Sequence, residues 1–147
     1  MAFVAGFHVS RSGFAGRKAL SGRQDEKRVY SAGASRVRML VLDATSTAEM
    51  DQILQSADEN LVVVDYSTSW CGPCKKFAPV FEELSDKYAD VVFVKVMGDA
   101  SAESSELMKR EGIRAVPAFH FWKQQQKVLD FTGARMDELE RNINELK

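Results

Sequence analysis

The stretch Leu61-Val62-Val63-Val64-Asp65-Tyr66, followed closely by Trp70-Cys71-Gly72-Pro73-Cys74-Lys75, decides the fold of this chain. Its first part is an almost continuous apolar run, which is typical of a strand buried on both faces. The cysteines follow where that strand should end and a helix should begin, because Gly72 permits a tight turn and Pro73 suits the first turn of a helix. We therefore expect the chemistry of the protein at a junction between a strand and a helix.

Periodic hydrophobicity begins near Val37 and alternates between strand-like and helix-like segments to the end of the chain. Before the quoted stretch, residues 37–42 are predicted as a strand, and a helix begins at a capping box of Ser46 and Glu49. After it, the pattern predicts a helix with Phe77, Phe81, Leu84 and Tyr88 on one face, followed by a strand over 91–96. A third helix should be capped by Asp99 or Ser101 and stop near Gly112. The chain should then form a hairpin of strands 118–122 and 127–131 around a turn at 123–126, and end in a helix whose apolar face comprises Met136, Leu139, Ile143 and Leu146. This order predicts an α/β domain with a central mixed β-sheet flanked by helices on both faces.

The charge of the chain is unevenly distributed along its length. With 147 residues, 45% of them hydrophobic, the chain is long enough for one domain with a proper core. Residues 1–38 contain eight basic and two acidic residues, a formal charge of +6, whereas residues 39–147 carry −7. The first 24 residues have no acid and mix Arg, Ser and Gly with Phe, which is typical of an organelle transit peptide. We expect residues 1–36 to be a mostly disordered transit peptide and residues 37–147 to be the folded domain.

The segment Arg28-Val29-Tyr30-Ser31 resembles a mitochondrial processing site, which favours the mitochondrial matrix, with the chloroplast stroma as the alternative. A secretory signal is not predicted, because an apolar stretch precedes the first Arg. A basic tail that is never removed, or that binds an acidic partner, is the other interpretation left open. No segment approaches the roughly 18 uninterrupted apolar residues that span a bilayer, so no membrane is expected as a partner. A nucleic acid is not expected as a partner either.

With only two cysteines, the chain cannot be a small domain held together by several disulfides. The Cys-x-x-Cys spacing of the pair indicates that the cysteines are reactive. Cys71 should face the unpaired backbone N–H groups and the positive end of the helix, which favour its thiolate. We expect Cys71 to be accessible and to attack, and Cys74, one turn inside the helix, to be shielded and to resolve. The alternative is half of a zinc site, which would need His8, His120 or carboxylates as further ligands.

The sequence Trp70-Cys71-Gly72-Pro73-Cys74-Lys75, after Val63-Val64-Asp65-Tyr66, resembles the active-site sequence of thioredoxins, and the resemblance extends over roughly 39–147. It implies a thioredoxin fold and a protein-disulfide reductase that uses a redox-active Cys71–Cys74 disulfide, with no bound cofactor and no metal. The Gly-Pro pair distinguishes this sequence from disulfide isomerases and strong oxidases. The implied partners are disulfide-containing client proteins and a thioredoxin reductase, either nicotinamide- or ferredoxin-dependent, and a monomer is expected.

The same resemblance assigns roles to residues outside the cysteine motif. It implies that Asp65 is a buried acid that deprotonates Cys74 and returns the proton, with Lys95 at the position of a neighbouring lysine. It implies a cis peptide bond before Pro117 and a substrate groove formed by Trp70, Val116, Pro117, Gly133 and Ala134. Retention of these residues together disfavours the rival interpretation, a thioredoxin fold used only as a binding module. Met97-Gly98-Asp99 departs from the acidic stretch usual in the family, and no physical reason is evident from the sequence.

Overall fold

The fold of residues 41–147 is described by a computed structural model. The elements are β1 (Leu42–Asp43), α1 (Thr47–Ala57), β2 (Val62–Ser67), α2 (Gly72–Lys87), β3 (Val92–Met97), α3 (Ala102–Arg110), β4 (Ala118–Lys123), β5 (Gln126–Thr132) and α4 (Met136–Leu146). This order confirms the sequence prediction. No helix within residues 41–147 is long and apolar enough to cross a membrane.

The five strands form one mixed sheet in the order β1-β3-β2-β4-β5. Strands β1 and β2 run parallel to β3, whereas β4 runs antiparallel to both β2 and β5. Strand β2 therefore lies at the centre of the sheet, and all six of its residues are buried. The apolar run at 61–66 is explained by this central position, since a strand covered on both faces has no side for solvent.

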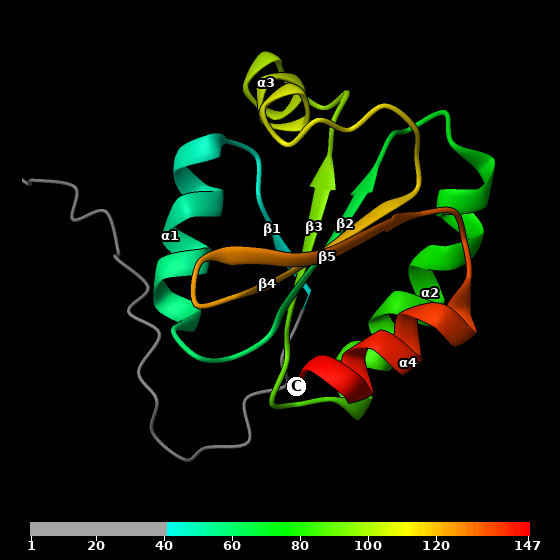
Figure 1. The fold of residues 1–147 in the computed structure, drawn as a ribbon. Coiled ribbons are helices and arrows are strands. Elements are labelled where there is room, and N and C mark those ends of the chain that lie inside the picture. The colour runs from blue at the N-terminus through cyan, green and yellow to red at the C-terminus, as the bar shows by residue number, and fades with distance from the viewer. Residues whose placement is uncertain (1–40) are drawn as a thin grey trace, which may run out of the picture. The chain divides into compact units, whose positions relative to one another are not determined.

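Two helices cover each face of the sheet (Figure 1). Helices α2 and α4 pack on one face through a cluster that includes Phe77, Phe81 and Leu139. Helices α1 and α3 pack on the other face through a cluster that includes Met50 and Leu107. Because alternate residues of a strand point to opposite faces, Val63 and Asp65 of β2 face α2, while Val64 and Tyr66 face α1 and α3. Helix α2, which follows the cysteine motif, thus lies over the face toward which Asp65 points.

The first predicted strand, at residues 37–42, lies only partly within the described residues. Residues 37–40 of the expected strand lie outside the described residues, Val41 is not part of a strand, and β1 comprises Leu42 and Asp43 alone. Among residues 41–147, strand β1 lies at the edge of the sheet and pairs with β3 alone. The predicted strand and β1 therefore share Leu42, and the prediction for residues 37–40 stays a prediction.

The helix caps differ in detail from the prediction. Ser46 accepts a hydrogen bond from the Glu49 backbone N–H at 3.2 Å, as in a capping box. The Glu49 carboxylate, however, accepts the backbone N–H of Thr45 at 2.8 Å and not that of Ser46, so the second hydrogen bond of the expected box lies one residue earlier. Helix α3 is capped by Ser101, which forms a reciprocal pair with Ser104, and not by Asp99. Asp99 is therefore free for another role.

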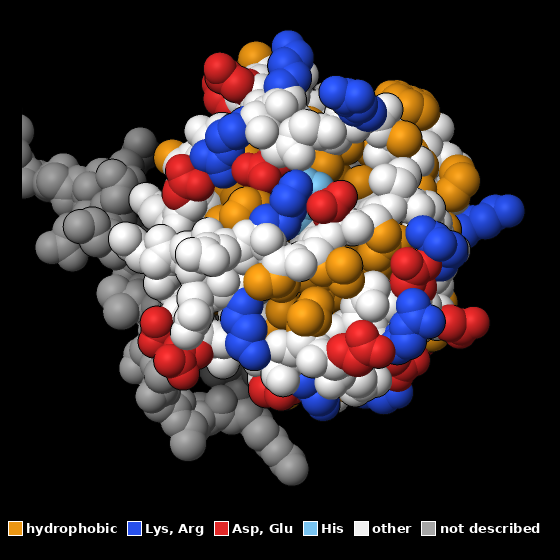
Figure 2. Space-filling view, in the orientation of Figure 1, with side chains coloured by type: hydrophobic (Ala, Val, Ile, Leu, Met, Phe, Trp, Pro, Cys, Tyr) orange, Lys and Arg blue, Asp and Glu red, His pale blue; other side chains and the backbone are white. Residues whose placement is uncertain are grey.

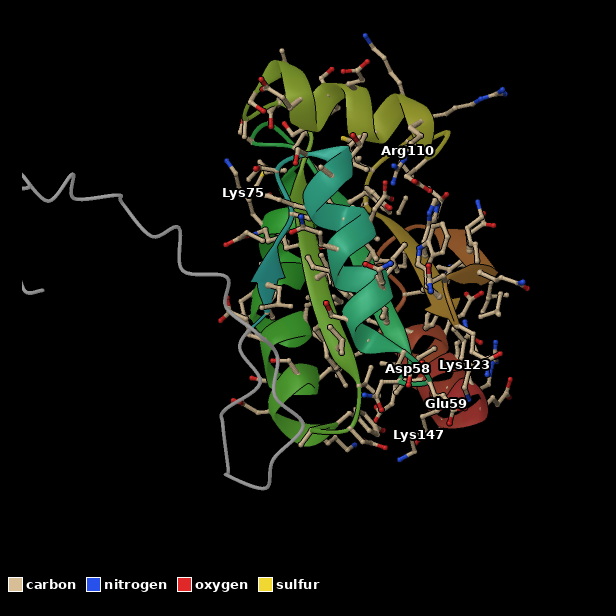
Figure 3. The ribbon with its side chains drawn as sticks, turned by 90° about the vertical axis from the view of Figure 1, so that its left-hand side faces the viewer. Asp58, Glu59, Lys75, Arg110, Lys123 and Lys147 are labelled. Carbon is tan, nitrogen blue, oxygen red and sulfur yellow. A yellow bond between two sulfur atoms is a disulfide. The ribbon has the colours of Figure 1, made fainter. Side chains whose placement is uncertain are left out.

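The β4–β5 hairpin closes through two residues, Gln124 and Gln125, with φ values of 51° and 62°. Positive φ at both positions matches the twist of a two-residue hairpin. The observed turn is shorter than the predicted turn at 123–126, because Lys123 belongs to β4 and Gln126 to β5. Lys123, at the end of β4, donates to the carbonyl of Leu146 at 2.8 Å, which ties the hairpin to the end of α4, and Figure 3 shows Lys123 and Lys147 at this end of the molecule.

Candidate active site

The two cysteines form a disulfide at the junction of β2 and α2, with Cα atoms 5.3 Å apart. Cys71 is the N-cap of α2, with Gly72 and Pro73 in the first helical turn. The Cys74 backbone N–H points at the Cys71 sulfur, 3.2 Å away. The N-cap position is where a helix presents its unpaired N–H groups and its positive end, and both favour a negative charge on Cys71. The predicted position of Cys71 is therefore confirmed.

Solvent exposure does not distinguish the two cysteines in this oxidised form. The relative exposure of Cys71 is 3% and that of Cys74 is 4%. The shielding of Cys74 is confirmed, whereas the expected accessibility of Cys71 is not found in the disulfide form. The feature that separates them is the hydrogen bond from the Cys74 N–H, which only the Cys71 sulfur accepts.

Asp65 is a buried carboxylic acid on β2, with a relative exposure of 2%. Burial raises its pKa from 3.8 to about 7, and the charge of Lys95 opposes that rise. The parallel register places Lys95 of β3 directly beside Asp65. Atom Oδ1 of Asp65 has no hydrogen-bond partner among residues 41–147. A carboxyl group with a pKa near 7 can both accept and donate a proton close to neutral pH.

A cavity of about 170 Å³ connects Asp65 with more exposed groups. Its lining includes Asp65 and Lys95 from the sheet and Ala78, Phe81 and Glu82 from α2, the helix that carries Cys74. The volume is sufficient for several water molecules, and the polar groups around it give such waters hydrogen-bond partners. Asp65 therefore has a route for exchanging its proton.

The loop before Trp70 is held by Asp99, a contact that sequence reasoning missed. The Asp99 carboxylate accepts the Ser69 backbone N–H at 2.9 Å and also bonds the Ser69 hydroxyl. These hydrogen bonds lower the pKa of Asp99 and keep it ionised. A Cβ on the adjacent Gly98 would lie 1.5 Å from the sulfur of Met108, so a larger residue there would require the Met108 side chain to move. The unusual Met97-Gly98-Asp99 sequence thus has a structural reason.

On the other side of the site, the Val116–Pro117 peptide bond is cis, the isomer that the resemblance implies. The carbonyl of Pro117 accepts the Gly133 N–H at 2.8 Å, which joins two of the expected groove segments. Gly133 has a φ of +110°, and this backbone conformation alone favours glycine, independently of any close contact with a client. Val116 is half-buried, while Ala134 and Trp70 are exposed, Trp70 to 74%.

A shallow hollow of about 390 Å³ lies beside the N-terminus of α2. It is lined by Gly72, Pro73, Lys76, Phe77 and Ala134. Of the residues predicted for the groove, only Ala134 lines this hollow, and Lys76 and Phe77 were not predicted. Phe77 was recognised as a core residue from its helical period, and Lys76 precedes it on the same helix. No signal within the sequence indicates which helical residues border a surface hollow.

The described residues include no group of three or more His, Cys, Asp and Glu side chains placed to hold a metal. Within them, His120 lies on β4 and packs against Tyr66, on the sheet face opposite α2. Burial lowers the pKa of His120 to about 4, which leaves the imidazole neutral near pH 7. His8, the other ligand considered from the sequence, lies outside the described residues.

Comparison with known proteins gives consistent results. A family model described as "Thioredoxin" matches residues 41–145. The chain is 42% identical to thioredoxin of Ovis aries over 107 residues, which cover 73% of this chain and 99% of that protein. It is similar to the crystal structure of thioredoxin f from spinach chloroplast (TM-score 0.69, 34% identity, 77% of this chain and 98% of that one). A complex of ferredoxin:thioredoxin reductase and thioredoxin f2 contains another similar chain (TM-score 0.68, 35% identity, 74% of this chain and 97% of that one).

Proposed function

The chain belongs to the thioredoxin family and is a protein-disulfide reductase that works by dithiol–disulfide exchange, and we propose how its own residues perform that exchange. Cys71 is the nucleophile and Cys74 is the resolving cysteine. The single observation that carries this assignment is the position of Cys71 at the N-cap of α2, with its sulfur accepting the Cys74 N–H.

The exchange consists of two balanced steps. The Cys71 thiolate attacks one sulfur of a client disulfide, forming a mixed disulfide, and the second client sulfur leaves as a thiolate that takes up a proton. The Cys74 thiolate then attacks the Cys71 sulfur, which forms the Cys71–Cys74 disulfide and releases the first client sulfur as a thiolate. Two electrons pass to the client, and the protein is left oxidised.

Asp65 acts on the proton of Cys74. Its carboxyl points to the sheet face covered by α2, and its raised pKa of about 7 makes it a base near neutral pH. The cavity shared with Lys95 and Glu82 supplies the path by which the proton reaches solvent. Trp70, Val116, Pro117, Gly133 and Ala134 border the client, and Gly72 and Pro73 shape the turn into the helix.

The oxidised protein must be returned to the dithiol by a separate reductase. The likeness to thioredoxin f2, found in complex with ferredoxin:thioredoxin reductase, supports a ferredoxin-dependent enzyme, and a nicotinamide-dependent reductase is the other candidate. Thioredoxins use their own cysteines without a prosthetic group, and the same is proposed for this chain.

The function is tested by reduction of a protein disulfide with dithiothreitol as the electron source. The full chain is expected to accelerate the reduction, and Cys71→Ser is expected to lower the rate to that of dithiothreitol alone. Serine also caps helices well, so the variant keeps the N-terminus of α2. Equal rates for the two proteins would contradict the role of Cys71.

Residues 1–36 are proposed to deliver the protein to an organelle. The basic, acid-poor composition supports this, Arg28-Val29-Tyr30-Ser31 supports the mitochondrial matrix, and the likeness to chloroplast thioredoxin f supports the stroma.

A fusion of residues 1–38 to a fluorescent protein is expected to accumulate in one of these two compartments. Its matched control replaces the basic residues Arg11, Arg17, Lys18 and Arg23 with Gln, which should leave the fluorescence in the cytosol. Diffuse fluorescence from both fusions would contradict the targeting function.

A further inference from the structure

Lys76 occupies an unusual place for a lysine, beside the reactive disulfide. It lines the hollow at the N-terminus of α2 together with Phe77, Pro73 and Ala134, and none of the lining residues within 41–147 is acidic. None of the carboxylates in residues 41–147 forms an ion pair with Lys76. Lys76 thus borders the space in which a client disulfide is proposed to lie, and its ammonium group has no ion-pair partner among residues 41–147.

The surroundings of Lys76 leave its charge uncompensated. Helices α1, α3 and α4 each have an acid in the first turn, whereas α2 has none there. Arg135, which follows Ala134 in the chain, is already paired with Glu138 at 2.7 Å and donates to the Thr132 carbonyl. Elsewhere acidic and basic side chains are intermixed on the surface, as the face in Figure 2 shows, and residues 39–147 carry a net charge of −7. The positive charge of Lys76 at the hollow is thus opposite in sign to the net charge of the domain.

We propose that Lys76 is a specificity-determining residue that selects clients with a Glu or Asp next to the disulfide. The proposal rests on the proposed function, because the hollow lies beside Cys71. A client carboxylate placed over Gly72 and Ala134 would meet the Lys76 ammonium, while Phe77 and Pro73 contact the apolar part of the same segment. The exposed ion pair would favour acidic clients by about two- to five-fold in kcat/KM at low ionic strength.

A second effect of Lys76 has to be separated from this one. A cation near Cys71 also favours the thiolate, and that effect would accelerate the reduction of every client equally. Selection by an ion pair, in contrast, depends on the charge of the client and is screened by salt, with a screening length of about 10 Å at 0.1 M. The ratio of rates for two clients that differ only in charge cancels any change in Cys71 itself.

The experiment uses the full chain and two peptides, each with one internal disulfide, identical except that the residues flanking the cystine are Glu in one and Gln in the other. The wild type is expected to prefer the Glu peptide by about two- to five-fold at 20 mM salt and to show no preference at 1 M. Lys76→Met should abolish the preference, measured as the ratio of the rates for the two peptides, and Lys76→Glu should reverse it. Lys75→Met is the matched control, since Lys75 is exposed, points outward in Figure 3 and does not line the hollow. It should keep the preference.

The outcomes distinguish the proposal from its alternatives. Equal rates for the two peptides with the wild type overturn the selection but leave the reductase function intact. A wild type that reduces neither peptide contradicts the exchange itself. If Lys76→Met slows both peptides equally and shifts the pH profile upward, Lys76 acts on the Cys71 thiolate, and selection by charge is rejected.

Discussion

Cys74→Ser is expected to accumulate a covalent complex with a client protein, whereas Cys71→Ser is expected to form none. With Cys74 removed, the Cys71 thiolate still attacks the client disulfide, but the mixed disulfide has no neighbouring thiolate to resolve it. The difference should be all or none within one turnover. Non-reducing electrophoresis with mass spectrometry measures it as an adduct of one chain and one client that dithiothreitol releases.

The two variants are closely matched, because each replaces one sulfur with an oxygen at a buried position of the same helical turn. Cys71 is the N-cap and Cys74 lies three residues later, with exposures of 3% and 4%. A general loss of folding would remove adducts from both variants and would appear in circular dichroism. An adduct formed by Cys71→Ser and not by Cys74→Ser would reverse the two roles.

The fold could be predicted from the sequence because its central elements carry strong local patterns. The apolar run at 61–66 indicates a strand covered on both faces, and Gly72-Pro73 after it indicates the start of a helix. The period of Phe77, Phe81 and Leu84 predicts the buried face of α2. These signals are local, since each depends on residues within one or two turns of the chain.

The parts of the site that were not predicted depend on distant residues. Asp99 bonds Ser69 across 30 positions of sequence, and neither residue indicates the other. Lys76 borders the hollow only because Ala134, from the segment before α4, lies opposite it. Such features depend on tertiary packing, which cannot be predicted from the hydrophobic periodicity of the sequence.

Asp65→Asn is expected to stabilise the oxidised protein at pH 8 while slowing the release of client. Burial raises the pKa of Asp65 to about 7, so the ionised carboxylate is destabilising in the folded state above that pH. A difference of about three pKa units corresponds to ~4 kcal/mol, and the buried amide retains some desolvation cost, so a gain of about 2–4 kcal/mol in the free energy of unfolding is expected. Urea denaturation measures the gain, and single-turnover kinetics measure the loss of resolution by Cys74.

The pH dependence of that gain identifies its cause. Between pH 4 and pH 7 the folded protein keeps the Asp65 proton that the unfolded chain has lost, so the wild type loses stability as pH rises through this window and the penalty is complete above pH 7. The gain in Asp65→Asn should therefore be small at pH 4, grow up to pH 7 and remain constant above it. Asp43→Asn, in the same cavity but exposed, is the matched control and should change stability by less than about 0.5 kcal/mol. An equal gain for Asp65→Asn at pH 4 and pH 8 would attribute it to packing of the amide, and Asp65 would then lose its assignment as a base that titrates near neutral pH.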